Sequence, residues 1–310
     1  MKILVTGGAG FIASHLTDAF VAAGHQVAII DDLSSGKREN LNPKATFYQL
    51  DVQDPGVAAV FQRERPEVLC HHAAQMDVRR SVADPVFDAR VNLLGLLNLM
   101  EHGRQHGLKR VLFSSTGGAI YGEQETFPAA ETHKLEPLSP YGVAKLASER
   151  YLFFYSTTYG ISYAALRYAN VYGPRQNPHG EAGVVAIFTE KLLRGERPII
   201  NGDGTQTRDY VYVGDLVRAN LAALQSDFTG ALNLGTGIET DVNVLFRHLR
   251  TLCGSDAPEQ HGPAKPGEQR RSVIDAGVAQ RVLGWRPQVS LEDGLRETVG
   301  FFRAKLQASA

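Results

Sequence analysis

Cysteines are scarce in this sequence of 310 residues, and the two that occur, Cys70 and Cys253, cannot build a disulfide framework. Long hydrophobic runs are also missing: no window approaches about 18 uninterrupted apolar residues, so no membrane span is predicted. The apolar start at 3–5 is broken by Thr6-Gly7-Gly8 before the core of a signal peptide could form. Together these absences predict a soluble, cytoplasmic protein.

Neither sign of charge dominates, because 32 lysines and arginines stand against 33 aspartates and glutamates, a formal net charge of −1. Proteins that bind nucleic acids or membrane surfaces usually present a basic excess, so no nucleic-acid or membrane partner is predicted. The 31 glycines follow no Gly-X-Y period, which excludes collagen, and 43% apolar residues exclude wholesale disorder. The length suits about two domains of roughly 150 residues each.

The first half of the sequence alternates short apolar runs with amphipathic stretches of helix length. The runs of strand length lie at 3–5, 27–30, 46–50, 67–71, 110–114 and 161–167. The stretches of helix length lie at 11–23, 54–63, 81–106 and 140–159. Asp54-Pro55 is typical of an N-cap followed by proline at the first helical position. The alternation predicts an α/β fold, a doubly wound parallel sheet with helices on both faces.

After Arg167 the alternation gives way to loop-like stretches rich in Gly, Pro and Asn, at 170–183, 201–204 and 258–267. Helix candidates lie at 184–195, 213–226, 240–253 and 290–306. We therefore predict a second, smaller and discontinuous C-terminal α/β domain whose loops face the carboxyl edge of the sheet. The predicted division assigns 1–168 and about 208–236 to the first domain, and 169–207 and 237–310 to the second.

A glycine-rich segment, Thr6-Gly7-Gly8-Ala9-Gly10-Phe11-Ile12-Ala13, follows the first predicted strand and opens the first helix. A tight turn there needs residues without a Cβ, so that backbone N–H groups and the positive helix end can approach a pyrophosphate. Turns use glycine for many reasons, but a position between a strand and a helix favours a dinucleotide site. The residues predicted to bind the cofactor here are Gly7, Gly10, Phe11 and Ile12.

The second strand ends in Asp31-Asp32, about 20 residues after the glycines, where a carboxylate accepts the ribose hydroxyls of an adenosine. The 2′-phosphate of NADP would be repelled by this charge, so NAD is the predicted cofactor. Asp51 could reach the adenine, although a plain turn carboxylate is nearly as good an interpretation. The predicted cofactor-binding set also includes Ser35, Gly36, Val52, Ala73, Ala74, Gln75 and Ser114.

Tyr141 and Lys145 stand four positions apart on a predicted helix and so share one face, with about 6 Å of rise between them. An ammonium group and a cationic nicotinamide beside a phenol lower the pKa of the phenol from about 10 towards neutrality. A pKa lowered by about 3 corresponds to roughly 4 kcal/mol and would make Tyr141 a general base. Ser114-Ser115-Thr116 ends a strand at the carboxyl edge, where a hydroxyl can hydrogen-bond the reacting oxygen.

These residues belong to a longer series of motifs that resembles the extended short-chain dehydrogenase/reductase family, and within it the UDP-hexose 4-epimerases. The resemblance covers nearly the whole chain and implies a Rossmann domain that binds NAD. Besides the glycine-rich segment it rests on His72-Ala73-Ala74-Gln75, Ser115-Thr116-Gly117-Gly118-Ala119-Ile120-Tyr121-Gly122, Tyr141-Gly142-Val143-Ala144-Lys145, Arg167-Tyr168-Ala169-Asn170-Val171-Tyr172-Gly173-Pro174-Arg175, Arg208-Asp209-Tyr210 and Leu283-Gly284-Trp285-Arg286-Pro287.

The resemblance implies a role for each matched position. In that family the tyrosine matched by Tyr141 takes a proton from a sugar hydroxyl, and the lysine matched by Lys145 holds the nicotinamide ribose. The hydroxyl residue matched by Thr116 orients the reacting oxygen, with Ser115 as the near alternative. Further implied cofactor residues are Asn92, a structural asparagine, and Tyr168, beside the nicotinamide. The implied substrate-binding residues are Thr116, Tyr141, Asn170, Val184, Val185, Phe188, Arg208, Lys265 and Ser272.

The implied activity is NAD-dependent 4-epimerisation of a UDP-hexose, UDP-glucose or UDP-galactose, through a transient 4-keto sugar. Ser272 is small at the position that limits space near C2 of the sugar, so a UDP-N-acetylhexosamine 4-epimerase is an alternative. A related sugar-nucleotide dehydratase or reductase is another, although Gly117-Gly118 stand where dehydratases carry Asp-Glu. A third alternative is a regulator that binds NAD without chemistry.

Two further expectations concern metals and assembly. His71-His72 has no second histidine pair at metal-binding spacing, so no metal site is predicted. Relatives dimerise by pairing two helices, which the resemblance places at about 81–106 and 140–159. The resemblance therefore implies a homodimer.

Overall fold

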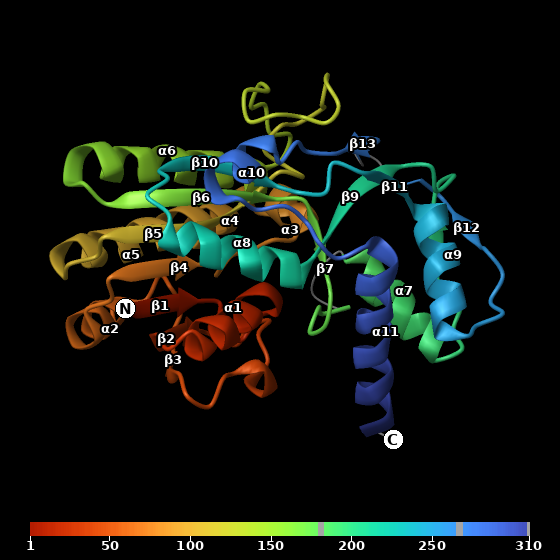
Figure 1. The fold of residues 1–310 in the computed structure, drawn as a ribbon, viewed down its shortest axis with the longest axis horizontal. Coiled ribbons are helices and arrows are strands. Elements are labelled where there is room, and N and C mark those ends of the chain that lie inside the picture. The colour runs from red at the N-terminus through yellow and green to blue at the C-terminus, as the bar shows by residue number, and fades with distance from the viewer. Residues whose placement is uncertain (179–182, 265–268, 309–310) are drawn as a thin grey trace.

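Seven strands form one parallel sheet at the centre of the molecule (Figure 1). The computed structural model describes residues 1–178, 183–264 and 269–308, and the sheet order is β10-β6-β5-β4-β1-β2-β3. The strands are β1 (Lys2–Thr6), β2 (Gln26–Asp31), β3 (Thr46–Gln49), β4 (Val68–His71), β5 (Arg110–Thr116), β6 (Ser162–Tyr168) and β10 (Gly230–Leu234). Every neighbouring pair runs parallel, which confirms the predicted architecture.

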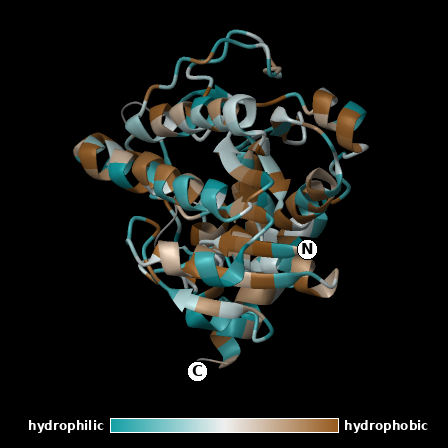
Figure 2. Ribbon diagram, turned by 90° about the vertical axis from the view of Figure 1, so that its left-hand side faces the viewer, coloured by the Kyte–Doolittle hydropathy of each residue, from teal (hydrophilic) through white to brown (hydrophobic). Residues whose placement is uncertain are grey.

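Helices cover both faces of this sheet. One face packs on α1 (Phe11–Ala22) and α8 (Val213–Gln225), and the other on α2 (Val57–Glu64), α5 (Gly95–Gln105) and α6 (Pro140–Tyr159). Successive residues of β1 alternate between the two cores, with Ile3 on the α1 side and Leu4 on the α5 side. Because both faces are buried, the strands are continuous hydrophobic runs, seen as brown ribbons inside the molecule in Figure 2.

The prediction that Asp54 caps a helix with Pro55 at its first position is wrong. The helix α2 begins at Val57, after Gly56. The Asp54 carboxylate accepts the N–H of Gly56 at 2.6 Å, and the N–H groups of Val57 and Ala58 bond carbonyls three positions back. These tight turns satisfy the local N–H groups and delay the first α-helical turn.

A single helix over 81–106 is also wrong, because this stretch is broken. It consists of α3 (Val78–Ala83), α4 (Pro85–Ala89), a wider helical segment η2 (Arg90–Leu94) and α5. Pro85 lacks the N–H that a continuous helix would need at that position. Asp84 instead caps α4, since its carboxylate accepts the N–H of Phe87 at 2.9 Å.

The second half forms a smaller lobe beyond the carboxyl ends of the parallel strands, at the right of Figure 1. Its helices α7 (Val184–Leu193), α9 (Val242–Cys253) and α11 (Leu291–Ala308) lie close to the predicted bounds and share one hydrophobic core. Its short strands are β7 (Asn170–Tyr172), β8 (Ile200–Asn201), β9 (Thr207–Tyr212), β11 (Glu239–Asp241), β12 (His261–Gly262) and β13 (Arg271–Ser272). β9 lies between β11 and β13 and also pairs with β7, so one strand organises most of the lobe.

The sequence pattern does not predict the helix α10 (Gly277–Leu283) or the strands β9 and β10, which lie after the regular alternation ends at Arg167. α10 returns to the large sheet and packs on β10. Trp285, just after α10, is buried in the α1 side of the sheet core, and its Nε1 donates to the Asp215 carbonyl oxygen at 2.8 Å. In the part of the chain that the structure describes, no helix is long and apolar enough to cross a membrane.

Candidate active site

The glycine-rich turn after β1 packs against the turn after β4, its neighbour in the sheet. Gly7 has a φ of +73°, and a Cβ there would lie 2.8 Å from the backbone nitrogen of Ala73, so only glycine fits. Gly10 precedes α1, and no side chain caps the first turn of this helix. Phe11 and Ile12 turn their side chains into hydrophobic cores, so only their backbone faces the turn. The carboxyl edge therefore offers helix N–H groups to an anion.

Asp31, at the end of β2, lies directly on this turn. Its buried carboxylate accepts the N–H groups of Ala9 at 2.9 Å and Leu33 at 2.8 Å. Burial raises the pKa of Asp31, and the two backbone donors oppose that shift. Asp32 points the other way: it is exposed and accepts the N–H and hydroxyl of Ser34. Of the two predicted carboxylates, the structure brings only Asp31 to the turn.

The remaining residues of the predicted adenosine side differ in their surroundings. Gly36 packs on Asp31, because a Cβ at Gly36 would lie 2.8 Å from Asp31 Oδ1, whereas Ser35 is exposed. Asp51 is also exposed and accepts the N–H of Gln53 at 2.8 Å, the geometry of a turn carboxylate. Val52 is buried against α5. The structure thus groups Gly36 with Asp31 and leaves the other three outside that cluster.

The turn after β4 is held by an asparagine on η2. The Asn92 side chain accepts the N–H of Gln75 at 2.9 Å and donates to its carbonyl oxygen at 2.8 Å, which clamps the end of Ala73-Ala74-Gln75. Asp88 on α4 accepts from the amides of both Asn92 and Gln75, at 2.9 and 3.0 Å. Asn92 therefore supports the turn after β4.

Lys145 lies on the buried side of α6, one turn after Tyr141. Its Nζ donates to the Ser114 carbonyl oxygen at 2.8 Å, 4.8 Å from the Phe113 ring centroid and 5.8 Å from the Tyr141 ring centroid. The end of β5 thus fixes the ammonium beside the half-buried Tyr141 ring. The helix α6 begins just before Tyr141, with Ser139 as its N-cap and Pro140 at its first position, and the Ser139 hydroxyl accepts the N–H of Gly142. Tyr141 and Lys145 are therefore four residues apart within one helix, which brings their side chains together.

Burial is the main electrostatic influence on Lys145. The side chain is 3% exposed, and desolvation lowers the pKa of Lys145 to about 8. The carboxylates of Asp88 and Glu149 act in the opposite direction and favour the charged amine. Burial also holds the pKa values of His71 and His72 well below their usual range, so both rings are neutral near Lys145.

The hydroxyl residues at the end of β5 separate into two environments. The Ser115 hydroxyl donates to the Glu149 carboxylate at 2.6 Å inside the protein. This bond occupies the hydroxyl of Ser115, so Ser115, predicted as the near alternative to Thr116, faces the α6 core. Thr116 and Asn170 both border Gly118: a Cβ on Gly118 would be 3.9 Å from Thr116 Oγ1 and 3.7 Å from Asn170 Oδ1.

Tyr168 occupies a buried position behind the site. Its hydroxyl hydrogen-bonds His72 Nε2 at 3.0 Å and accepts the amide of Asn220 at 2.9 Å. The side chain is 4% exposed, and burial raises the pKa of Tyr168 far above its usual range. The structure therefore places Tyr168 under the turn after β4, where it supports that turn through His72.

On the side of the smaller lobe, Arg208 and Ser272 are paired residues of β9 and β13. Arg208 Nη1 donates to the Thr207 carbonyl oxygen at 2.7 Å, and Ser272 is buried. The buried carboxylate of Asp209, the next residue, accepts the N–H groups of Thr236 and Gly237. Lys265 falls outside the described residues.

The helix α7 supplies backbone rather than side chains to the lobe's inner edge. Val185 and Phe188 are buried in the core of the smaller lobe, and Val184 packs partly against it. No side chain caps the first turn of α7, which follows Gly183. Val185 and Phe188 therefore hold α7 in the core, and Val184 is the least buried of these three predicted residues.

An ion pair that the sequence did not predict is buried behind α6. The Glu149 carboxylate accepts from Arg167 Nε at 3.0 Å and Nη2 at 2.7 Å, and both side chains are almost fully buried. Glu149 is four residues after Lys145, so the spacing Tyr-x-x-x-Lys-x-x-x-Glu is the signal that could have found it. Within the described ranges, no group of three or more His, Cys, Asp or Glu side chains could hold a metal ion.

The parallel doubly wound sheet, the glycine turn and the Tyr141-Lys145 pair define the class of NAD-binding α/β enzymes. Within that class the chain belongs to the NAD dependent epimerase/dehydratase family, which it matches over residues 3–235.

Several relatives resemble the chain along its whole length. A UDP-glucose 4-epimerase from Mycolicibacterium smegmatis is 46% identical over 314 residues, 99% of this chain and 100% of that protein. The structure of a UDP-glucose 4-epimerase from Thermotoga maritima with UDP-glucose has a TM-score of 0.97 and 51% identity, covering 99% of this chain and 100% of that one. The Thermus thermophilus UDP-glucose 4-epimerase in complex with NAD has a TM-score of 0.94 and 46% identity, covering 98% and 99%.

Proposed function

We propose that this protein catalyses NAD-dependent 4-epimerisation of a UDP-hexose and interconverts UDP-glucose and UDP-galactose through a transient 4-keto sugar. One observation carries the proposal: a buried lysine, Lys145, is anchored by Ser114 beside the Tyr141 ring at the edge where the glycine turn also ends. Full-length relatives at 46 to 51% identity are UDP-glucose 4-epimerases. This agreement supports the same reaction for this chain.

The carboxyl edge fits a dinucleotide. A Cβ at Gly7 would collide with Ala73, and the first turn of α1 is uncapped, so the edge can cradle a pyrophosphate. In the proposal Asp31 binds the adenine ribose, and its charge disfavours the 2′-phosphate of NADP. Lys145 binds the nicotinamide ribose. Bound in this cradle, NAD⁺ would supply a reversible hydride acceptor for C4 of the sugar, so the reaction would bring no net oxidation.

In the proposal Tyr141 and Thr116 act directly on the sugar hydroxyl, and Lys145 acts through Tyr141. Tyr141 removes the proton of the 4-hydroxyl and gives it back after the sugar has turned. The positive charge of Lys145 beside the ring favours the phenolate that this step requires. Thr116 orients the reacting oxygen, and Ser115 is excluded from this role in the proposal because its hydroxyl is bonded to Glu149.

The smaller lobe would bind the rest of the substrate. Arg208 offers a guanidinium fork that suits a diphosphate, and in the proposal Asn170 contacts the same diphosphate. Asn170 and Tyr210 are paired residues of β7 and β9, so the asparagine and the arginine come from adjacent strands. In the proposal Lys265 assists with the diphosphate, and the first turn of α7 receives the uracil.

A second candidate substrate is a UDP-N-acetylhexosamine. Ser272 has a small side chain at the position that the family uses to limit space near C2. A UDP-N-acetylglucosamine 4-epimerase from Methanobrevibacter ruminantium has a TM-score of 0.93 and 35% identity to this chain. A dehydratase is disfavoured, because Gly117 and Gly118 carry no carboxylate at the positions where dehydratases have Asp-Glu.

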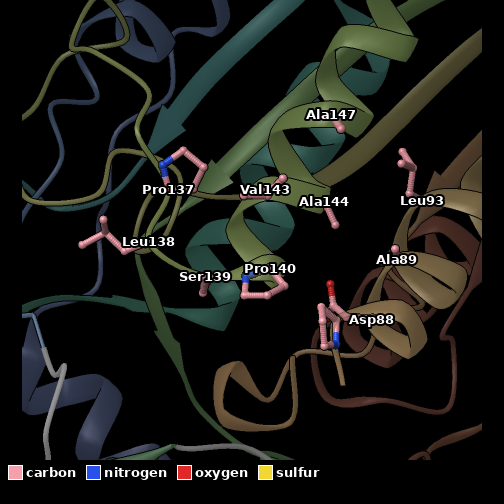
Figure 3. Close-up of a pocket in the computed structure, with 11 residues that line it drawn as sticks. Asp88, Ala89, Leu93, Pro137, Leu138, Ser139, Pro140, Val143, Ala144 and Ala147 are labelled. Carbon is pink, nitrogen blue, oxygen red and sulfur yellow. The ribbon is translucent and has the colours of Figure 1, made fainter. Parts of the chain in front are cut away.

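We propose that two copies of the chain pair through α4 and α6. An apolar groove of about 520 Å³ lies between these helices, with Asp88 at its base (Figure 3). Exposed apolar side chains continue the surface along both helices, among them Val86, Val143, Phe153 and Phe154. Burial of this surface in a homodimer would remove it from water, as expected for a patch of this kind.

Two assignments complete the proposal. Residues 1–168 with about 208–236 would form the dinucleotide domain, and 169–207 with 237–310 the sugar-nucleotide domain, although α10 packs on β10 of the first. The cytoplasm is the proposed compartment, because both cysteines, Cys70 and Cys253, are free.

The test is to incubate the purified protein with UDP-galactose and NAD and to resolve the sugar nucleotides by chromatography. Formation of UDP-glucose without net NADH absorbance supports the proposal, whereas no UDP-glucose refutes it. Tyr141→Phe should lower turnover by about 10²–10⁴-fold while NAD stays bound. A regulator without chemistry would be indifferent to this substitution, which separates the two functions.

A further inference from the structure

The segment 270–275 passes between the two lobes of the molecule, and one of its edges bonds to the smaller lobe. The Thr207 N–H on β9 donates to the Arg270 carbonyl oxygen at 3.0 Å. Two positions further along, Ser272 of β13 is paired with Arg208 of β9. This edge of the segment therefore lies against the strand that carries Arg208, the proposed diphosphate ligand.

The opposite edge of the same segment bonds to the loop between β5 and α6, in the larger lobe that holds the parallel sheet. The Ala129 N–H donates to the Val273 carbonyl oxygen at 2.9 Å, and the Ala129 carbonyl oxygen accepts the N–H of Asp275 at 2.9 Å. Alternate residues of an extended strand face opposite ways, so 270 and 272 can bond to β9 while 273 and 275 bond to this loop. The segment 270–275 is thus a strand shared by both lobes.

Gln124 contributes a side chain to the larger-lobe edge of the shared strand. Its Oε1 accepts the Val273 N–H at 3.0 Å, and the glutamine is 7% exposed. Because the donor is a backbone N–H, the oxygen of the amide must face it, which fixes the orientation of the side chain. Gln124 Nε2 is buried and has no hydrogen-bond partner within the part of the chain that the structure describes. The hydrogen bond that this side chain supplies to the shared strand is therefore the one made by its oxygen.

The shared strand lies against both halves of the proposed substrate site. A Cβ on Gly117, the residue after Thr116, would lie 2.6 Å from Ile274 Cδ1, so Ile274 packs on the turn at the end of β5. Two residues earlier, the buried Ser272 is the pairing partner of Arg208. Three consecutive residues thus connect the neighbour of Thr116 to Arg208. A displacement of the strand would move one of these proposed substrate ligands relative to the other.

We infer that Gln124 is a positioning residue for sugar-nucleotide binding, because it holds the shared strand at the spacing that lets a UDP-hexose contact both lobes. Without this acceptor the buried Val273 N–H has no partner, and conformations with a displaced strand become populated. A UDP-hexose must then restore the strand when it binds, so its apparent affinity falls with the fraction of competent molecules. The inference rests on the proposed function, since it concerns the same substrate.

The test compares KM and kcat for UDP-galactose with the affinity for UDP, measured by isothermal titration calorimetry on the full-length, NAD-loaded protein. Gln124→Met keeps the side chain long and unbranched but removes the acceptor. Gln124→Glu keeps an oxygen in place of Oε1, and its second oxygen displaces no bond, since Nε2 has no partner among the described residues.

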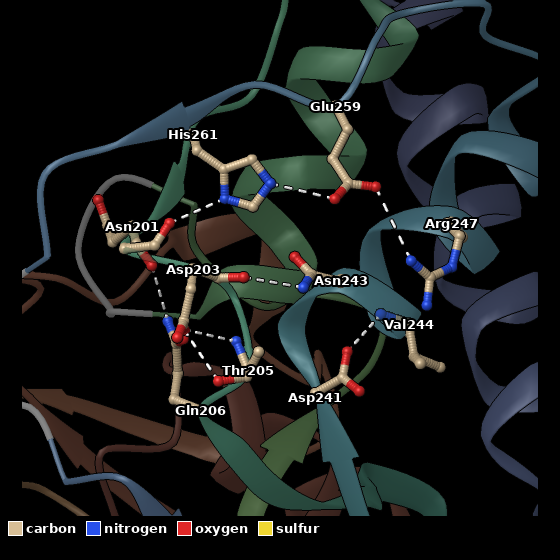
Figure 4. A network of polar contacts seen from close by, with 11 residues as sticks. Asn201, Asp203, Thr205, Gln206, Asp241, Asn243, Val244, Arg247, Glu259 and His261 are labelled. Carbon is tan, nitrogen blue, oxygen red and sulfur yellow. Dashed lines mark hydrogen bonds and ion pairs between the residues drawn. The ribbon is translucent and has the colours of Figure 1, made fainter.

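Asn243→Leu is the matched control. The Asn243 amide donates to the Asp203 carbonyl oxygen at 2.9 Å, a bond that lies within the smaller lobe (Figure 4). As in Gln124, the other polar atom of the side chain, Oδ1, is buried without a partner in the described ranges. The control therefore also removes a bond from a side chain to the backbone, but leaves the contact between the lobes intact.

Gln124→Met should raise KM for UDP-galactose by on the order of 10-fold, the effect of one buried hydrogen bond. Its kcat and its affinity for UDP should stay near the wild-type values, because UDP contacts only the smaller lobe in the proposal. Gln124→Glu and Asn243→Leu should keep the wild-type KM. An unchanged KM in Gln124→Met would overturn the inference, as would an equal rise in Gln124→Glu or an equal weakening of UDP and UDP-galactose.

Hydrogen–deuterium exchange of the wild-type protein gives a second test that does not depend on the folding of a variant. UDP-galactose should slow the exchange of the Ala129 N–H several-fold in the NAD-loaded protein, because a ligand that bridges the lobes stabilises the shared strand. UDP alone should leave this exchange unchanged. Exchange that does not respond to UDP-galactose would overturn the inference.

The same preparations distinguish a failure of this inference from a failure of the proposed function. A wild-type protein in which UDP-galactose slows the exchange of Ala129 but yields no UDP-glucose supports the shared strand and refutes the reaction. A protein that epimerises UDP-galactose with the same KM in wild type and Gln124→Met refutes the role of Gln124 alone.

Discussion

The carboxylate of Glu149 and the guanidinium of Arg167 form a bidentate ion pair inside the protein, with distances of 3.0 and 2.7 Å. The Ser115 hydroxyl donates to the same carboxylate, and Arg167 also donates to the Tyr121 hydroxyl. This network ties α6 to β5 and β6 one helical turn beyond Lys145. It thereby holds the helix that carries the proposed catalytic pair against the end of the sheet.

Glu149→Gln should lower the free energy of unfolding by about 3–5 kcal/mol, because the change leaves the Arg167 charge buried without a counter-charge. Urea denaturation measures the effect. Glu292→Gln is the control, since its pair with Arg296 on α11 is more than half exposed and should change stability by less than about 1 kcal/mol. Similar losses of unfolding free energy in both variants would show that the buried ion pair stabilises the fold no more than the exposed pair does.

Asp88→Asn should shift the alkaline limb of the pH–activity profile to lower pH. The Asp88 charge raises the pKa of Lys145, which burial has lowered to about 8. An asparagine keeps the carbonyl oxygen that Gln75 and Asn92 share but removes the charge, so the pKa of Lys145 falls further. Since the proposed mechanism needs a charged Lys145, activity is lost as pH rises through that pKa.

The measurement is kcat/KM for UDP-galactose between pH 6 and pH 10, a range centred on the lowered pKa of Lys145, about 8. The midpoint of the alkaline limb should move to lower pH by up to about one pH unit. Asp88→Ala, which also removes the contacts to Gln75 and Asn92, should weaken NAD binding in addition. An unchanged limb in Asp88→Asn would mean that the Asp88 charge does not act on Lys145.

Gly7→Ala should weaken NAD binding by on the order of 10-fold or more, because the added Cβ would lie 2.8 Å from the backbone nitrogen of Ala73. Fluorescence titration of the apoprotein with NADH measures the affinity. Gly24→Ala is the matched control: its φ of +81° is equally left-handed, but nothing lies within 4 Å of its Cβ position. It should cost about 1–2 kcal/mol of stability and leave NADH affinity unchanged.

Ser272→Tyr should discriminate between the two candidate substrates. The buried Ser272 is paired with Arg208 in the sheet of the smaller lobe, so a large side chain there would project beside the proposed diphosphate ligand. We expect KM for UDP-N-acetylglucosamine to rise by on the order of 10-fold or more, with a smaller change for UDP-galactose, which lacks the N-acetyl group. Equal effects on both substrates would show that residue 272 does not limit the space near the C2 substituent of the sugar.

The sequence alone determined the parallel sheet, most helices, the glycine turn and the helix that carries Tyr141 and Lys145. These features follow from short-range rules: hydrophobic periodicity, caps, and residues four apart on one helix face. The same rules failed where local alternatives compete, at Asp54 and at the break before Pro85.

Only the tertiary structure decided which hydroxyl and which carboxylate turn towards the site. Ser115 is held by Glu149 from a helix 34 residues away, and Asp31, unlike Asp32, is held by the turn at Ala9. The carboxylate of Asp88 is likewise held by the amide of Gln75, 13 residues earlier in the chain. Such orientations arise from packing and from the need to satisfy buried polar atoms, which no local pattern encodes.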